Sequence, residues 1–174
     1  SGLTYLCANF YEITDPDGTP ALGGLVTGKG YEIKEYTVGG NKVKIGFVGI
    51  DTPESISKGT PSNFQTPDGN YKYTFDGLEH SPAAFYKTVQ DSVDAARGAG
   101  AEYIVVMGHT GDQGVMPGWS SYEIIANTTG IDVFLDGHAH SVIEGTNVQN
   151  KSGQNVLLTS TGTKLENIGC LKLT

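Results

Sequence analysis

The 174-residue sequence predicts an α/β domain built around a largely parallel sheet. The main observation is a repeated unit: an amphipathic helix followed by an apolar strand at residues 81–109, and the same succession at residues 120–140. Right-handed crossovers would make the two strands parallel neighbours, with their carboxyl ends at one edge of the sheet. A chain of this length can bury its own core, so we expect a single domain over residues 1–174.

The first half of the chain predicts strands and one long loop. LTYLCANF, at residues 3–10, has the pattern of a short strand. The run IKEYTVGGNKVKIGFVGI predicts a hairpin that turns at GGN, and its second strand becomes apolar, as a central strand does. Residues 51–79 are rich in Pro, Gly, Ser and Asn without a sustained period, which predicts an irregular excursion at the mouth of the fold.

The second half contains the two helix and strand units. Ser81 as N-cap and Pro82 at the first helical position predict a helix that ends near Gly98 and Gly100, with one apolar face formed by Phe85, Val89, Val93 and Ala96. Ser120 and Glu123 form a capping-box pattern for the second helix. Beyond residue 140 we expect two short strands around NKSGQ and a last strand at NIGCLKLT, so that the tail is antiparallel or mixed.

Composition excludes some classes of partner. A formal net charge of −8 is the opposite of what binding to nucleic acid requires, so we expect no nucleic-acid partner. No apolar run is long enough to cross a bilayer, and the first residues lack the pattern of a signal peptide. The chain starts without Met, and we expect it to be part of a longer protein. Cys7 and Cys170 have no CxxC spacing and are expected to be buried in two strands, although a disulfide between them stays open.

Three histidines follow the apolar strands of the repeated unit. His109 ends AEYIVVMGH behind Gly108, and His138 and His140 end IDVFLDGHAH behind Gly137. Because the carboxyl ends of parallel strands meet at one edge, we expect the three imidazoles to converge there, where α/β sheets place their ligand sites. Convergent neutral imidazoles suit Zn, Mn, Fe or Ni, so the sequence predicts a metal or phosphate site.

The neighbouring polar residues leave alternatives open. Asp112 could accept a hydrogen bond from a ligand imidazole or could be a turn residue. Asp136 could be a ligand beside His138 or could face away and cap the loop. His80 lies in a loop with no such context and is expected to be ordinary.

At GHTGDQG and DGHAHSVIEG the sequence resembles the calcineurin-like metallophosphoesterases, and more closely their 5′-nucleotidase branch of bacterial periplasmic or cell-wall enzymes. YLCANF, KVKIGFVGIDTPES and VLLTSTGTKLENIGCLKL extend the likeness over nearly the whole chain, but only over the latter half of the family's catalytic domain. The resemblance implies a partial four-layer α/β/β/α fold of mixed sheets with flanking helices. It also implies a hydrolase that acts in nucleotide catabolism and lies outside the cell, in the cell wall or in the periplasm.

The resemblance implies a two-metal site in the full-length parent, with divalent ions such as Zn or Mn. His109 and His138 would hold one ion and His140 the other. The family's D-x-H and G-N-H-[DE] elements are not in this sequence, so no catalytic residue is expected in this segment beyond these ligands. The segment is therefore expected to be inactive alone, while the parent hydrolyses nucleotides or other small phosphate esters. Unpaired sheet edges would favour self-association of the segment.

Two other functions remain open. Three histidines and a water could form a single-zinc hydrolase that needs no further ligands. Alternatively, the chain could be a non-catalytic binding or structural domain that has lost half of its site.

Overall fold

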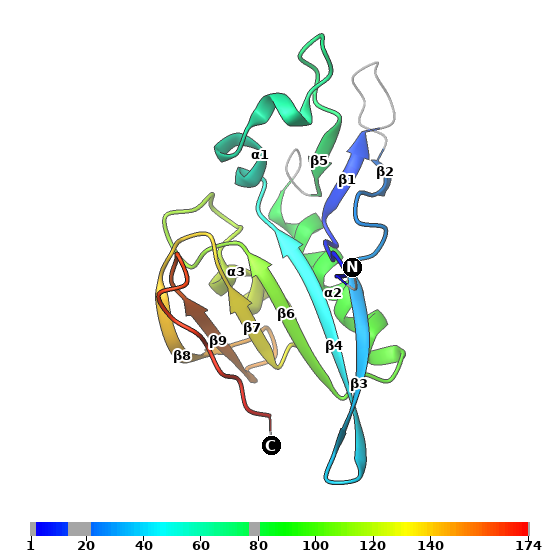
Figure 1. Cartoon of the computed structure of the whole chain (residues 1–174), viewed down its shortest axis with the longest axis vertical. Coiled ribbons are helices and arrows are strands. Elements are labelled where there is room, and N and C mark those ends of the chain that lie inside the picture. Colours follow the sequence, from blue (N-terminus) through cyan, green and yellow to red (C-terminus); the bar gives the residue numbers. More distant parts are fainter. Residues whose placement is uncertain (1–2, 14–21, 77–80, 174) are drawn as a thin grey trace.

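A six-stranded mixed sheet is the centre of the structure, a computed structural model that describes residues 3–13, 22–76 and 81–173. Four strands in the middle are parallel, and one antiparallel strand lies at each edge (Figure 1). In spatial order the strands are β3 (Tyr31–Val38), β4 (Asn41–Asp51), β6 (Tyr103–His109), β7 (Val133–Asp136), β9 (Asn155–Thr161) and β8 (Val142–Gln149). The predicted α/β class and the parallel pairing of the two repeated strands are confirmed.

The predicted hairpin is confirmed as β3 and β4. Val38 pairs with Asn41 across a two-residue turn formed by Gly39 and Gly40, with φ of 59° and 86°. Positive φ at both central residues is the turn whose twist matches that of the flanking strands, and glycine adopts it without steric cost. The β4 strand then passes into the middle of the sheet, where Val48 is fully buried.

Helices cover one face of this sheet. In Figure 1, α2 (Pro82–Gly98) and α3 (Ser121–Asn127) lie behind the strands, whereas the red segment that follows β9 passes in front of them. The predicted apolar face of α2 is confirmed, because its four side chains are all fully buried: Phe85, Val89, Val93 and Ala96. The predicted capping box of α3 is also confirmed. Ser81 precedes α2 as predicted, but its side chain makes no capping hydrogen bond.

Residues 51–79 differ from the predicted irregular excursion. The described part contains α1 (Glu54–Lys58), a 3-10 helix η1 (Pro61–Phe64) and β5 (Tyr73–Phe75). The β5 strand joins β1 (Phe10–Ile13) and β2 (Leu22–Leu25) in a second, three-stranded sheet, in the order β2-β1-β5. Aromatic packing explains why this segment adopts regular structure. The ring of Phe10 stacks on Phe75 with centroids 4.8 Å apart and meets Phe64 edge-on with centroids 6.3 Å apart. These contacts join positions far apart in sequence, which local periodicity does not detect.

Both predicted end strands were wrong. Residues 3–9 form no ladder, although Ala8 donates a backbone hydrogen bond to Gly49 of β4 at 2.8 Å, and the first strand starts only at Phe10. Residues 162–173 contain no strand. Lys164 and Leu165 have φ of 55° and 60°, in the left-handed region, so the backbone turns just before the predicted strand, and residues 167–172 beyond the turn are exposed.

The two cysteines are free, and neither lies in a strand. Cys7 is buried as predicted, but Cys170 is exposed. Burial raises the pKa of the Cys7 thiol to about 11. Within the described residues, no helix is both long enough and apolar enough to span a membrane.

Thiol chemistry should therefore distinguish the two cysteines. At pH 8 a pKa near 11 leaves roughly 0.1% of Cys7 as thiolate, and burial also blocks access, so only Cys170 should react with a disulfide reagent in the folded chain. We expect one reactive thiol per chain in buffer and two in denaturant. Cys170→Ser should abolish the fast reaction, and a folded Cys170→Ser chain that still reacts quickly would contradict the placement of Cys7.

Candidate functional site

Parallel pairing brings the ends of β4, β6 and β7 to one edge of the sheet. Asp51, the last residue of β4, lies in register with His109, the last residue of β6. The β7 strand pairs with β6 as far as Leu135 and ends at Asp136, so Gly137 and His138 follow at the same edge. Three consecutive parallel strands thus deliver an aspartate and two histidines to one place.

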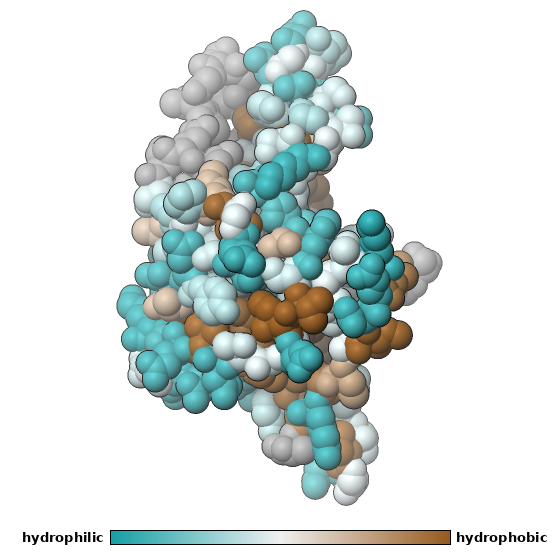
Figure 2. Space-filling model, turned by 90° about the vertical axis from the view of Figure 1, so that its left-hand side faces the viewer, coloured by the Kyte–Doolittle hydropathy of each residue, from teal (hydrophilic) through white to brown (hydrophobic). Residues whose placement is uncertain are grey.

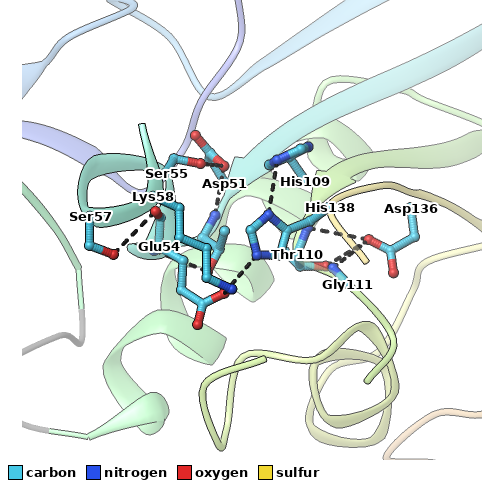
Figure 3. Close-up of polar contacts among 11 residues, drawn as sticks. Asp51, Glu54, Ser55, Ser57, Lys58, His109, Thr110, Gly111, Asp136 and His138 are labelled. Carbon is cyan, nitrogen blue, oxygen red and sulfur yellow. Dashed lines mark hydrogen bonds and ion pairs between the residues drawn. The ribbon is translucent and has the colours of Figure 1, made fainter. Parts of the chain in front are cut away.

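The side chains of His109 and His138 meet at this edge. The Nδ1 atom of His138 lies 3.1 Å from Nε2 of His109, and the ring centroids are 4.8 Å apart with the ring planes inclined by 76° (Figure 3). These positions are 29 residues apart in sequence. The structure therefore brings together two of the three histidines that the sequence predicted.

The chain reaches this position through a strained turn. His138 has φ of 76°, and the Ala139 N–H donates to the carbonyl of Gly137 at 3.0 Å, which closes a three-residue turn around His138. A non-glycine residue in this region costs about 1–3 kcal/mol and persists only where the surroundings impose it. Strain of this kind concentrates at functional sites, which is consistent with a site at His138.

Asp136 and Asp112 hold the two histidine loops together. A single oxygen, Oδ1 of Asp136, accepts hydrogen bonds from the backbone N–H groups of Thr110, Gly111 and Gly137 at 3.3, 3.0 and 2.8 Å. Of the two predicted roles, Asp136 therefore caps the loop. Asp112 accepts a hydrogen bond from the Ser141 hydroxyl at 2.6 Å and none from the imidazoles that the structure describes, so it too acts between the loops. These bonds position His109 relative to His138.

Glu54 of α1 is a partner of His138 that the sequence did not predict. Its Oε2 atom lies 2.6 Å from Nε2 of His138 and 2.7 Å from the Lys58 ammonium group. Burial alone would raise the pKa of Glu54, but the hydrogen bonds from Lys58 and His138 outweigh it and lower the pKa. The sequence did contain a signal for this residue. Glu54 follows Pro53 and precedes Lys58 by four residues, a spacing that is typical of an ion pair on a helix.

Asp51 is the second residue that the sequence did not predict as part of the site. Its Oδ1 atom accepts hydrogen bonds from the Thr52 N–H at 2.8 Å and the Ser55 hydroxyl at 2.7 Å. Burial raises its pKa against the lowering effect of these bonds and of the nearby histidines. The fully buried Asn9 fixes its backbone, donating to the Asp51 carbonyl at 2.7 Å and accepting from its N–H at 3.0 Å. The sequence signal was available, since Asp51 ends an apolar strand as His109 does.

The contacts of His138 leave one of its nitrogens suited to a metal ion. An ionised Glu54 only accepts hydrogen bonds, so Nε2 of a neutral His138 carries the hydrogen and Nδ1 keeps its lone pair toward His109. The 3.1 Å separation from Nε2 of His109 agrees with the roughly 3.0–3.4 Å expected between two ligand atoms that each lie about 2.1 Å from one ion. A carboxylate behind a ligand imidazole is also a common feature of metal sites. The pair therefore offers two of the ligands that a divalent ion requires.

The third predicted ligand does not join this pair. His140 is exposed, has φ of 58°, and makes no side-chain contact with either histidine among the described residues. Within residues 3–13, 22–76 and 81–173, no three His, Cys, Asp or Glu side chains are arranged to hold a metal ion. His80 lies outside the described residues. The proposed role of His140 remains a prediction.

Comparison with known proteins establishes the fold. No model of a protein family matches the chain, and no curated protein matches it significantly. A crystal structure of the calcineurin-like phosphoesterase YfkN from Bacillus subtilis matches 91% of this chain and 46% of its own length, with a TM-score of 0.59 and 18% identity. GAP50, the anchor in the inner membrane complex of Plasmodium, matches 83% of this chain and 41% of its own length with 16% identity, but its TM-score of 0.40 is too low to carry an argument.

The predicted fold class is thus confirmed: two sheets with flanking helices, matching part of a calcineurin-like phosphoesterase fold. The chain spans about half the length of the YfkN structure. At this level of identity the likeness concerns the fold alone.

Removal of the Asp136 carboxylate should destabilise the chain. Asp136→Ala would leave the N–H groups of Thr110, Gly111 and Gly137 without their acceptor, and we expect the free energy of unfolding to fall by about 2–4 kcal/mol. Denaturant unfolding monitored by circular dichroism measures this. Asp132→Ala, which breaks the bond to Arg97 at the opposite end of β7, is a control that should leave metal binding unchanged, whereas Asp136→Ala should weaken it.

The histidine pair should bind one divalent ion in solution. We expect calorimetric titration with Zn²⁺ to give one site, which His109→Ala or His138→Ala abolishes and His140→Ala leaves nearly unchanged. Glu54→Gln should weaken binding about 10–100-fold, because the amide no longer provides a charged acceptor for His138. Glu35→Gln, which removes a glutamate paired with Lys42 on the hairpin, is the matched control. Unchanged affinity after loss of both His109 and His138 would refute the site.

Proposed function

We propose that this chain is the second half of the catalytic domain of a metallophosphoesterase that hydrolyses small phosphate esters. The observation that carries the proposal is the contact between His109 and His138, at 3.1 Å, on the carboxyl edge of a sheet with this fold. The fold supports the class of phosphoesterases, and the paired imidazoles are a reason to expect divalent-metal chemistry.

The reaction is the cleavage of a phosphate ester by water, which yields an alcohol and inorganic phosphate. A divalent ion bound by His109 and His138 would acidify a water molecule and neutralise charge on the phosphate. Glu54, whose carboxylate lies 2.6 Å from Nε2 of His138, would hold the hydrogen on that nitrogen and so leave the lone pair of Nδ1 for the ion. In the complete domain, His140 is proposed to hold a second ion together with ligands from outside this chain.

The face of the central sheet that no helix covers supports the proposal that this chain is half of a domain. The side of the central sheet opposite α2 and α3 carries partly exposed apolar side chains, including Met107 at 38% exposure. A pocket of about 360 Å³ lies on the same side, with Leu135, Leu157 and Leu171 in its wall. Figure 2 views the molecule from the side on which β8 lies in Figure 1, and hydrophobic surface extends across the middle of this side as well, between hydrophilic regions. We propose that the remainder of the catalytic domain packs here, since uncovered apolar surface of this kind marks an interface.

The finer assignments are proposals as well. They comprise a nucleotide substrate, as in the 5′-nucleotidases, and a place in the cell wall, the periplasm or outside the cell. The segment without its other half is proposed to be inactive, because two imidazoles leave an ion with few protein ligands. In the absence of that half, the antiparallel edges β3 and β8 are the strands through which copies could associate.

Activity measurements on the isolated chain and on the full-length parent test this function. We expect the chain alone to release no phosphate from 4-nitrophenyl phosphate or adenosine monophosphate in the presence of Zn²⁺ or Mn²⁺. The parent should hydrolyse at least one of them, and His109→Ala or His138→Ala should lower its kcat/KM by about 100-fold or more. Glu35→Gln is the control that should retain activity.

Two outcomes would replace the proposal. Turnover by the isolated chain that is lost with His109→Ala, His138→Ala or His140→Ala would indicate the single-zinc hydrolase. A metal-loaded parent that cleaves neither ester and has no D-x-H or G-N-H-[DE] element would indicate a non-catalytic binding domain.

A further inference from the structure

A pocket of about 380 Å³ adjoins the histidine pair on the side of α1. Glu54 connects the pocket to the histidine pair, because it lines the pocket and its Oε2 atom also lies 2.6 Å from Nε2 of His138. The rest of the wall is mostly apolar or aromatic: Ile13, Pro53, Ile56, Ser57, Tyr71, Tyr73, Thr74 and Met116. The volume lies in the range of about 300–1,000 Å³ that is usual for small-molecule sites, and such sites are also predominantly apolar with a few polar groups.

The aromatic wall of this pocket is pre-organised. The ring of Tyr73 lies 5.4 Å from Phe10 and 6.3 Å from Phe64, so its position is fixed by the core of the smaller sheet. The backbone of Tyr71 pairs with Gln65, and the next N–H, that of Lys72, donates to the Phe64 carbonyl at 2.8 Å. Rigid aromatic surfaces bind flat ligands at a small entropic cost.

Tyr71 differs from the other aromatic side chains of this region. Phe75 is buried at 3% exposure and packs within the core, whereas Tyr71 is 46% exposed at the pocket. A tyrosine that lines a cavity and remains half exposed has a ring surface free for a ligand. This side chain is therefore not accounted for by loop packing.

The charges around the pocket determine which part of a ligand it can accept. Among the described residues, Glu54 is the only charged side chain in the wall of this pocket, and it is paired with the Lys58 ammonium group at 2.7 Å. No positively charged side chain among the described residues lines the pocket, so its wall offers a phosphate no charged partner. A phosphate ester would thus place its phosphate on the histidine side of Glu54 and its uncharged part among the tyrosines.

From this geometry we infer that the pocket between α1 and β5 binds the leaving group of the substrate, and that this group is an uncharged aromatic or heteroaromatic ring. The inference rests on the proposed phosphoesterase function, since the phosphate must lie at His109 and His138. Tyr71 is the specificity-determining residue, because its ring can stack on the leaving group.

Binding of two phosphate esters to the Zn²⁺-loaded chain tests this inference. Phenyl phosphate and methyl phosphate carry the same charge and differ in the leaving group. We expect phenyl phosphate to bind about 10-fold more tightly by calorimetry or NMR titration. Tyr71→Ala should reduce this preference to less than about 3-fold without changing the affinity for methyl phosphate, and Tyr71→Phe should retain it.

Tyr36→Ala is the matched control, because Tyr36 is 45% exposed on the distant edge strand β3, almost as exposed as Tyr71. This substitution should change neither the affinity for phenyl phosphate nor the affinity for methyl phosphate. Equal binding of the two esters by the unchanged chain would overturn the inference, and so would a preference for phenyl phosphate that survives Tyr71→Ala.

Phenol, which has no phosphate, separates this inference from the proposed function. Its binding should weaken with Tyr71→Ala in the presence or absence of Zn²⁺, so the pocket is tested even if no metal binds. If methyl phosphate binds equally well before and after removal of Zn²⁺ with a chelator, the proposed function fails. If methyl phosphate requires Zn²⁺ but phenol binding is indifferent to Tyr71→Ala, only the leaving-group site is refuted.

Discussion

The register of three parallel strands is the constraint on which the site depends. Because β4, β6 and β7 end at one edge, His109 and His138 come within 3.1 Å although the chain makes a complete helical crossover between them. Parallel pairing alone would leave the loops free to move apart. The Asp136 carboxylate prevents this by accepting from the N–H groups of both loops, and the strained turn at His138 is retained within that frame. Fold and site are therefore coupled. Loss of the Asp136 carboxylate should disturb the positions of the two imidazoles before it disturbs the packing of the hydrophobic core.

The segment between β4 and α2 determines which side chains surround the histidines at this edge. The aromatic contacts of Phe10, Phe64 and Tyr73 hold η1 and β5 against β1. The α1 helix follows directly after β4 and places Glu54 against His138. The Glu54 carboxylate therefore has two roles. It accepts a hydrogen bond that orients the His138 imidazole, and it lines the largely apolar pocket beside α1. The chain as a whole carries a net charge of −8, which disfavours the approach of a phosphate. Local positive charge from a divalent ion at the histidines would reverse that effect where the ester must bind.

Sequence reasoning succeeded where the signal was local and failed where packing between distant segments decided the outcome. The buried face of α2, the capping box of α3 and the turn at Gly39 and Gly40 each follow from neighbouring residues, and each was predicted. The strand periodicity also predicted that His109 and His138 would share an edge. Glu54 was missed although Pro53 and the spacing of Glu54 and Lys58 mark a helix turn. What no local pattern reveals is the ordering of η1 and β5, which comes from aromatic contacts with Phe10. The predicted strand at NIGCLKLT is wrong because residues 167–173 pair with no described strand, and a local pattern does not show whether a partner strand is available.

The central claim is that Nδ1 of His138 and Nε2 of His109 face one metal ion while Nε2 of His138 stays protonated toward Glu54. Long-range proton–nitrogen NMR correlations of the histidine rings test it directly, because metal binding shifts the resonance of the bonded nitrogen. On addition of one equivalent of Zn²⁺, the account predicts shifts to metal-bound values for His138 Nδ1 and His109 Nε2, with His138 Nε2 remaining a protonated nitrogen. A shift of His138 Nε2 instead, or no change at either ring, would contradict it.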